Sequence, residues 1–326
     1  MSFKMTHYVK VEGFKAFSCH SMEWKRHLDN YADYGRFVIP AVCRLVGAPE
    51  DYDSTVATGL QFREGEKVTL ACGYDGKNVV RFQGFIKRIN YKVPLEVECE
   101  GYSYQLRKKR MPNKSYKDTP LRTILFDIIK DTDIQLSTKI PDVKLTVTFR
   151  DCNGLECLDW LKDKVLLTAY FEFDVLYVGL RYLNNYGTVV KHRLNWNVIK
   201  DDELLFETNK EGADVRIHLL VADKTKGKVG IGNNKYSQVK QLKVSGVSSG
   251  DAFLQQLQTD KQTQQNIHGY SGRITAFLEP IADLNMVSQI IDQKYQERNG
   301  KYVIEGVEGS FSRSGGRQKI QIGISV

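Results

Sequence analysis

The first 110 residues alternate apolar and polar side chains with a period of two, the pattern of β-strands that bury one face. Turn sequences such as GYDGKN and NYKVP separate the alternating segments. The clearest of these segments are HYVKVEGFKAFSC (7–19), FVIPAVCRL (37–45), KVTLACGYDG (67–76), VVRFQGFIKRI (79–89) and LEVECEGY (95–102). Several strands joined by short turns predict a small antiparallel barrel or sandwich over residues 1–112.

Residues 113–200 show a different pattern, because apolar residues recur there at helical spacing. Thr119-Pro120 is typical of a helix start, with Thr as the N-cap and Pro at the first helical position. The apolar residues after it share one helical face: Leu121, Ile124, Leu125, Ile128 and Ile129. A second helix is predicted from near Asn153, followed by two strands in 170–182 and a turn at Asn184-Asn185. This order predicts a small α+β domain.

Strands return in residues 201–326. Segments 214–223 and 238–248 alternate, and the Gln-rich stretch 248–266 is either a short helix or an ordered loop. Asp283 is the predicted N-cap of a helix over 284–298, whose apolar face holds Val287, Ile290 and Ile291. A β-hairpin over 300–326 closes the chain. We therefore expect a second β-domain with one helix before its C-terminal hairpin.

Two of the predicted hairpins share a local pattern that suggests an internal repeat. VRFQGF (80–85) and YVIEGV (302–307) both read apolar, any, apolar, Gln or Glu, Gly, apolar. A second glycine follows 17 positions later in each, Gly101 after Gly84 and Gly323 after Gly306, although the alternation before it is out of step by one residue. Glycine inside a strand marks a bulge, a bend or a close backbone approach. Gly84 and Gly306 are therefore predicted to be bends that curve a sheet into a barrel wall.

Composition narrows the class of protein. The 326 residues are enough for two or three domains, and 41% hydrophobic and 26% charged residues are ordinary for a soluble globular protein. The N-terminus lacks the apolar region of a signal peptide. The most apolar long run, residues 165–180, contains Glu172 and Asp174, so no membrane-spanning segment is expected. The six cysteines form no CxxC pair, and reduced thiols are expected, as in a cytosol.

The chain contains no recognisable catalytic, cofactor or metal motif. The glycines of GKVGIGNN (227–234) are in the order GxxGxG with strands on both sides, so a hairpin loop is favoured over a dinucleotide-binding loop. GxSxG and HExxH are absent, and the six histidines are scattered. We therefore expect no enzymatic activity, no catalytic residue, no cofactor and no metal site.

Charge leaves one alternative open. The formal net charge is +8, and the densest basic run consists of Arg107, Lys108, Lys109 and Arg110. Three tyrosines interleave with the basic residues around it: Tyr102, Tyr104 and Tyr116. Charge combined with stacking aromatics is found in proteins that bind single-stranded nucleic acid. A basic run at a domain boundary is also typical of a protein-contact surface. One hypothesis is therefore a basic nucleic-acid-binding or polysaccharide-binding β-protein.

The order of the segments resembles the baseplate hub proteins of contractile phage tails and related injection systems. GEKVTLACGYDG (65–76), RFQGFIKRI (81–89) and LEVECEGYSYQLRKKR (95–110) are similar to the family's first domain, in which F-x-G-x-I precedes a hairpin that returns to a charged tail. The helical segments from TPLRTILFDIIKDTDIQL (119–136) to residue 182 resemble its inserted domain, and residues 284–309 resemble part of its second tube-like domain. The likeness is closest to the hubs of Mu-like phages and the hub half of type VI secretion spikes.

The resemblance implies an α+β, mainly β fold. Two tube-like antiparallel β-barrel domains, residues 1–112 and 201–326, would flank a smaller α+β domain, residues 113–200. It implies a homotrimer that forms a pseudo-sixfold ring, joins the tail tube to the central spike and lines the delivery channel.

Implied partners are further copies of the chain, a tail tube protein, a spike protein and other baseplate proteins, with DNA only as passing cargo. The implied location is the baseplate of a virion tail, assembled in the cytoplasm of a bacterial host. In such a ring, basic residues in the channel would slow passing DNA. The run Arg107–Arg110 is therefore expected to face a partner protein.

Overall fold

The computed structural model describes residues 4–44, 55–182, 186–207, 213–221, 224–229, 238–249, 251–265 and 269–326. Most regular structure in these residues is β, which confirms the predicted mainly β class with helices. The described residues contain four α-helices, α1 (Ser103–Lys108), α2 (Leu121–Ile129), α3 (Gly154–Lys164) and α4 (Asp251–Gln265). They also contain two 3-10 turns, η2 (Thr58–Gln61) and η3 (Gln296–Arg298).

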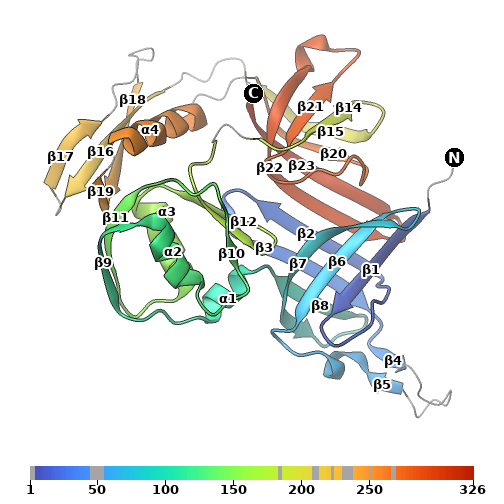
Figure 1. The fold of residues 1–326 in the computed structure, drawn as a ribbon. Coiled ribbons are helices and arrows are strands. Elements are labelled where there is room, and N and C mark those ends of the chain that lie inside the picture. Colours follow the sequence, from blue (N-terminus) through green and yellow to red (C-terminus); the bar gives the residue numbers. More distant parts are fainter. Residues whose placement is uncertain are drawn as a thin grey trace.

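One large sheet runs through the molecule (Figure 1). Its main path runs in the order β1 (Met5–Val11), β6 (Lys67–Tyr74), β7 (Lys77–Asn90), β8 (Leu95–Glu100), β3 (Asn30–Ile39), β2 (Ser21–His27), β22 (Gly300–Ser312), β23 (Gly315–Ser325), β20 (Gly269–Ala276), β15 (Val198–Glu207). Two further strands lie off this path: β21 (Val287–Ile291) pairs with β22, and β14 (Val189–Arg193) pairs with β21. Within the described chain β1 and β15 end the main path, so its hydrogen bonds do not close into a barrel.

The sheet consists of two units with the same strand order. The first unit is β1-β6-β7-β8-β3-β2 and the second is β14-β21-β22-β23-β20-β15, with six strands in each. Corresponding strands also occur in the same order along the chain, so β2 corresponds to β15, β3 to β20, β7 to β22 and β8 to β23. Only the outermost pair differs in direction, because β1 and β6 are antiparallel whereas β14 and β21 are parallel. This shared strand order is what an internal duplication of a β-domain would produce.

Each unit has its own hydrophobic core, built by the alternation of its strands. Phe82 and Ile86 of β7 are buried in the first core, and Ile304 and Ile322 of β22 and β23 are buried in the second. The second unit contributes to the first core, because Leu278 from the connection between β20 and β21 is fully buried there. Burying a leucine completely contributes roughly 2 kcal/mol, so this contact helps to hold the units together.

A helical layer with small sheets lies beside the two units, drawn in green in Figure 1. Its strands are β9 (Lys114–Pro120), β10 (Gln135–Leu136), β11 (Lys144–Phe149), β12 (Thr168–Glu172) and β13 (Val175–Gly179). A second group, consisting of α4 and four strands, continues this layer: β16 (Ala213–Val221), β17 (Lys224–Val229), β18 (Gln238–Ser245) and β19 (Val247–Ser249). A separate ribbon of β4 (Val42–Arg44) and β5 (Thr55–Ala57) projects from the first unit.

Residues 213–265 are an insertion within the second unit, since they connect β15 to its antiparallel partner β20. Val215, Ile217 and Leu254 of the insertion share one hydrophobic core with Ile124 and Leu158 of the helical layer. The predicted domain limits at residues 112 and 200 stay a prediction, and this packing connects segments on both sides of residue 200.

The helix predicted over residues 284–298 is wrong. Val287–Ile291 forms strand β21, which pairs with β14 and β22, and only Gln296–Arg298 forms a 3-10 turn. Asn285 has a positive φ of 60°, which a helix does not tolerate. The Asp283 side chain binds Arg26 instead of capping a helix. The spacing of Val287 and Ile290 fits a helix, but strand partners on both edges outweigh that preference.

Helix starts elsewhere follow the sequence more closely. Helix α3 begins at Gly154, next to the predicted start near Asn153, and Asn153 and Glu156 form a capping box at its N-terminus. Helix α2 begins at Leu121 with Pro120 as its N-cap, one residue later than expected. The stretch 248–266 contains helix α4, which decides between the two predicted alternatives. The turn Asn184-Asn185 and residues 230–234 of the glycine-rich loop lie outside the described residues.

Candidate assembly site between the two β-units

The two units are joined edge to edge by β2 and β22. These strands pair antiparallel from Ser21 opposite Ser312 to His27 opposite Gly306. An ion pair of 2.6 Å between Lys25 and Glu308 crosses the junction. A Cβ at Gly309 would collide with the indole ring of Trp24, so a glycine is required under this ring. The junction shows how one unit adds to the edge of another.

Arg26 of β2 connects three parts of the chain at this junction. Its Nε donates to Asp33 of β3 at 3.3 Å, and its Nη1 donates to Asp283 at 2.5 Å. Its Nη2 donates to the carbonyl oxygen of Phe171 in β12 at 3.1 Å, and the guanidinium lies over the ring of Phe173. Both β-units and the helical layer are therefore held by one buried guanidinium.

The carboxyl of Asp33 is buried with this guanidinium. Burial and, to a lesser degree, the nearby Asp283 carboxyl raise the pKa of Asp33 to about 7, against the opposing effect of Arg26, and within the described residues its Oδ1 atom has no hydrogen-bond partner. Burial alone would lower the pKa of Arg26, but the carboxyl groups of Asp33 and Asp283 outweigh burial and raise it. Arg26 therefore stays charged, and the protonation of Asp33 depends on pH near neutrality.

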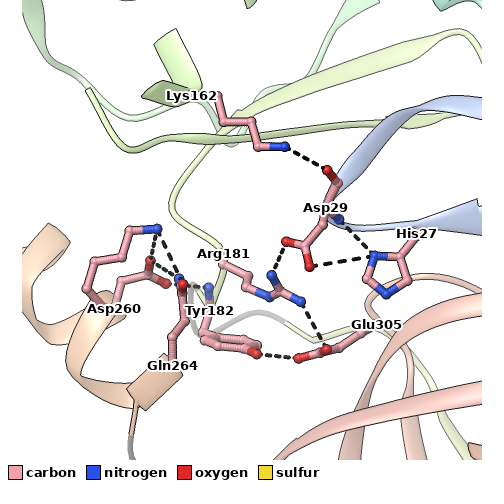
Figure 2. Close-up of polar contacts among 9 residues, drawn as sticks. His27, Asp29, Lys162, Arg181, Tyr182, Asp260, Gln264 and Glu305 are labelled. Atoms are coloured by element: carbon pink, nitrogen blue, oxygen red, sulfur yellow. Dashed lines mark hydrogen bonds and ion pairs between the residues drawn. The ribbon is translucent and has the colours of Figure 1, made fainter. Parts of the chain in front are cut away.

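A second polar cluster lies where the helical layer meets the units (Figure 2). Arg181 donates to Asp29 in the β2–β3 turn and, at 2.9 Å, to Glu305 of β22. The hydroxyl of Tyr182 donates to the same Glu305 carboxylate. Lys162 of α3 donates to the carbonyl oxygen of Asp29 at 3.1 Å. These contacts fix the helical layer against both units at once.

Helix α4 of the insertion is attached to this cluster. The backbone N–H of Tyr182 donates to Asp260 of α4 at 2.8 Å, and Gln264 donates to the other oxygen of that carboxyl at 2.7 Å (Figure 2). Burial raises the pKa of Asp260 and lowers the pKa of the adjacent Lys261. The two shifts have one cause, since burial disfavours the charged form of either group. The cluster is thus built for positioning, and five segments of the chain converge on it.

Gly84 and Gly306 occupy corresponding strands, β7 and β22. A Cβ at Gly84 would collide with the carbonyl oxygen of Glu100 in the neighbouring strand. Gly306 follows a register irregularity between Ile304 and Gly306 and lies against the ring of His27. Both positions thus show a close approach, but of different groups. Their role as equivalent bends stays a prediction.

The two hairpins differ in register. In the first hairpin Phe85, the residue after Gly84, lies opposite Glu100, the residue before Gly101. In the second hairpin Gly306 lies opposite Gln321, two residues before Gly323. The second glycines therefore take different places. A Cβ at Gly84 would approach the Cα of Gly101 at 2.8 Å, but Gly323 lies against Glu305. The turn between the strands is shorter in the second hairpin, which shifts its returning strand.

The four residues of the basic run have different environments. Arg107 pairs with Glu100 at 2.8 Å, and Lys87 pairs with the same carboxylate. Burial alone would raise the pKa of Glu100, but these two pairs outweigh burial and lower it. Lys109 donates to the carbonyl oxygens of Asp127 and Lys130 at the C-terminal end of α2, where a cation is favoured. Lys108 and Arg110 remain exposed. The run is thus no uniform surface patch.

The tyrosines near the basic run are used in packing. Tyr104 stacks on Phe85 with ring centroids 5.6 Å apart, and Tyr102 meets the same ring edge-on at 5.3 Å. Tyr116 is buried, and its hydroxyl donates to Asp127 at 2.8 Å. A platform for stacking bases needs open aromatic faces, which these three rings do not form together.

No group of three or more His, Cys, Asp or Glu side chains in the described ranges is arranged to hold a metal ion. No helix of the described chain is long and apolar enough to cross a membrane. The six cysteines are free thiols.

Sequence reasoning missed the buried network around Arg26 and Arg181. In the sequence, Arg26 and Asp33 look like ordinary polar positions of two β-strands. The sequence does not show that Arg26 binds Asp283, which is 257 residues away. One signal was present: two acidic residues, Asp29 and Asp33, flank the turn of a hairpin that also carries Arg26.

Comparison with solved structures gives one fold over nearly the whole chain. A prophage MuSo2 tail protein from Shewanella oneidensis is 12% identical with a TM-score of 0.63, and the match covers 99% of this chain and 97% of that one. A tail protein from Neisseria meningitidis MC58 is 15% identical with a TM-score of 0.65, covering 98% and 96%. A component of the Escherichia coli type VI secretion system, described as structurally similar to T4 bacteriophage tail proteins, is 11% identical with a TM-score of 0.58, covering 98% and 76%.

No protein-family model matches the chain, and no curated protein matches it in sequence. At the identities found, the shared feature is the fold. The resemblance seen in the sequence is thus confirmed at the level of fold: the chain has the fold of phage and prophage tail proteins and of a type VI secretion component.

Proposed function

We propose that this chain is a structural baseplate hub of a phage tail or a tail-like injection machine. Three copies would form a ring with pseudo-sixfold symmetry that joins the tail tube to the central spike and lines the delivery channel. The observation that carries this proposal is the presence of two six-strand units of one topology in a single chain. Three chains then offer six similar units around one axis, which adapts a sixfold tube to a threefold spike.

The units would act as tube-like domains whose walls are completed between subunits. Within one chain the main strand path has two ends, so a closed wall requires further strands. The helical layer and the insertion would lie outside the wall, attached through Arg26 and Arg181. The second tube-like domain would then be discontinuous, with residues 213–265 belonging to the outer layer.

The partners of such a hub would be a tail tube protein on one face, a spike protein on the other and further baseplate proteins around it. The ring would belong to the virion tail and assemble in the cytoplasm of a bacterial host. DNA would pass through as cargo. Arg107, Lys108 and Arg110 are the exposed residues of the basic run, and Lys108 and Arg110, which do not pair with Glu100, would contact a partner protein.

The basic nucleic-acid-binding or polysaccharide-binding protein is the competing hypothesis. Its basis in the sequence was a basic run interleaved with tyrosines. The packing of Tyr102 and Tyr104 against Phe85 and the use of Lys109 on α2 remove part of that basis. The similar solved chains are named as tail proteins or as a secretion-system component, which favours a structural role without catalysis.

Light scattering on the purified protein, with single-stranded DNA binding measured at two salt concentrations, separates the hypotheses. The hub proposal expects a trimer of about 112 kDa, three chains of 37.3 kDa, and little binding to DNA. A monomer of 37.3 kDa whose affinity for DNA falls steeply with salt would support the alternative instead.

A further inference from the structure

Two cysteine side chains meet at the start of helix α3. The Sγ atoms of Cys152 and Cys157 are 3.5 Å apart, a direct contact between two thiols. Cys157 is fully buried, whereas Cys152 is half-buried at the surface. A disulfide bond has an S–S distance of about 2.05 Å, so the two sulfur atoms need to approach by only about 1.5 Å to form one.

The contact has a defined place in the capping geometry of α3. Cys152 is the residue before the N-cap Asn153, and Cys157 is the fourth residue of the helix. Apolar side chains at these two positions often pack on each other and form the hydrophobic staple, which fixes how a chain enters a helix. In α3 both staple positions are cysteines. The folded chain therefore holds a staple that oxidation can make covalent.

Hydrogen bonds hold the backbone on both sides of this contact. Asn153 Oδ1 accepts from the N–H groups of Leu155 and Glu156 at 2.9 and 3.1 Å. The Glu156 carboxylate accepts from the N–H of Asn153 at 2.7 Å, and the carbonyl oxygen of Cys152 accepts from the N–H of Met111 at 2.9 Å. Because the fold already holds the two thiols together, joining them costs little further order.

The two thiols differ in their access to solvent and in their acidity. Burial, followed by the contact with Cys152, raises the pKa of Cys157, so this thiol stays protonated in the reduced protein. Cys152 is partly open to solvent and can meet a small molecule. Cys152 is therefore the thiol that reacts first, and Cys157 is placed to attack the product.

We propose that Cys152 and Cys157 form a redox modification site, at which a low-molecular-weight disulfide such as oxidised glutathione produces an intramolecular disulfide bond. The Cys152 thiolate attacks one sulfur of the small disulfide, which leaves a mixed disulfide and releases one small thiol. Cys157 then attacks the Cys152 sulfur, and the second small thiol leaves. The proton that each cysteine loses is taken up by a departing thiolate. Two protein thiols are oxidised, and one small disulfide is reduced to two thiols.

The disulfide would secure the helix that connects the helical layer to the first unit. In α3, Asp159 accepts from the hydroxyl of Tyr31 in β3, and Lys162 donates to the carbonyl oxygen of Asp29 at 3.1 Å. A bond at the start of α3 restricts the unfolded chain and keeps this end of the helix from fraying. The site would hold thiols in the reducing cytoplasm and close after release from the host. This timing rests on the proposed function, whereas the disulfide itself does not.

Treatment of the folded protein with oxidised glutathione tests the site. The remaining thiols are then blocked with iodoacetamide in denaturant, and the protein is digested with trypsin. Cleavage after Arg150 and Lys162 places both cysteines on one peptide, residues 151–162. This peptide should lack two hydrogen atoms and carry no alkyl group, and the oxidised protein should melt about 2–4 °C higher than the reduced one. The other four cysteines are internal controls and should form no protein disulfide: Cys19, Cys43, Cys72 and Cys99.

Two variants check the role of each thiol. Cys157→Ala should retain glutathione on Cys152 and gain no melting temperature, because no second thiol resolves the mixed disulfide. Cys152→Ser should take up no glutathione at position 157 while folded, because that thiol is buried. Circular dichroism of both variants confirms that they fold before they are oxidised.

Three results would overturn this inference. The first is a peptide 151–162 that stays alkylated at both cysteines once the folded protein has reached equilibrium with the oxidant. The second is a disulfide that lowers the melting temperature. The third is a disulfide that forms as readily in urea-unfolded protein, which would show that sequence spacing rather than the fold brings the thiols together. None of these results depends on the mass of the particle, so a monomer that forms the disulfide overturns the ring and leaves this site intact.

Discussion

Arg26 and Asp283 are 257 residues apart in the sequence and 2.5 Å apart in the structure. The contact ties the second strand of the first unit to the loop that leads into β21 of the second unit. The Arg26 side chain is buried, the Asp283 side chain is partly exposed, and the contact lies beside the β2–β22 junction. The relative placement of the two units, on which any ring depends, therefore rests on a defined ion pair.

Replacing Arg26 by Ala should lower the free energy of unfolding by about 3–5 kcal/mol, because it leaves the buried Asp33 carboxyl without its cation. Urea unfolding followed by tryptophan fluorescence measures this loss. Lys25→Ala is the matched control, since its pair with Glu308 is exposed and is worth about 0–1 kcal/mol. Equal losses in the two variants would contradict the role of Arg26.

The pKa of Asp33 predicts a pH dependence of stability. Burial raises this pKa from an ordinary value near 4 to about 7, so the folded state holds a proton that the unfolded state has lost between these values. The contribution of this group to stability should therefore fall as pH rises through that window. Asp33→Asn should flatten the decline in unfolding midpoints measured across it. An unchanged slope in the variant would show that other groups cause the decline.

Gly84→Ala should destabilise the first unit by about 1–3 kcal/mol, because the added methyl group meets the backbone oxygen of Glu100, which cannot move without its strand. Gly306→Ala should cost less, because the methyl group meets the side chain of His27. Gly187→Ala is the control, with its nearest neighbour 3.5 Å away. Thermal melts of the three variants rank these effects, and a Gly84→Ala protein as stable as the control would refute the close approach.

The basic run should divide into structural and free residues. Lys109→Ala should lower the unfolding temperature by removing a cation from the carbonyl end of α2, an effect of about 0.3–1 kcal/mol. Lys108→Ala and Arg110→Ala should leave the melting temperature unchanged and weaken binding to a partner protein. Calorimetry with pull-down of the neighbouring tail proteins checks both parts. Loss of partner binding in Lys109→Ala alone would reverse this assignment.

The sequence predicts the strands and helices of the chain where its patterns are local. Alternation around Phe82 and Ile86 is visible in the sequence, and so is the start of a helix near Asn153. The glycine pattern at Gly84 and Gly306 indicated a duplication, and the strand order supports it.

Features that depend on distant partners could not be predicted in this way. Val287–Ile291 has helical spacing and is a strand because β14 and β22 flank it. Lys109 looks like part of a surface run and is bound to the end of α2, a contact that local sequence does not encode. The pairing of Arg181 with Glu305 likewise depends on how the helical layer docks.

The most direct test of the proposed hub is an electron cryomicroscopy reconstruction of the purified protein or of the tail assembly that contains it. The proposed function predicts a ring of three chains around an open channel, with six similar β-units arranged about the axis. A closed particle without a channel, or a ring whose number of chains is not three, would contradict it.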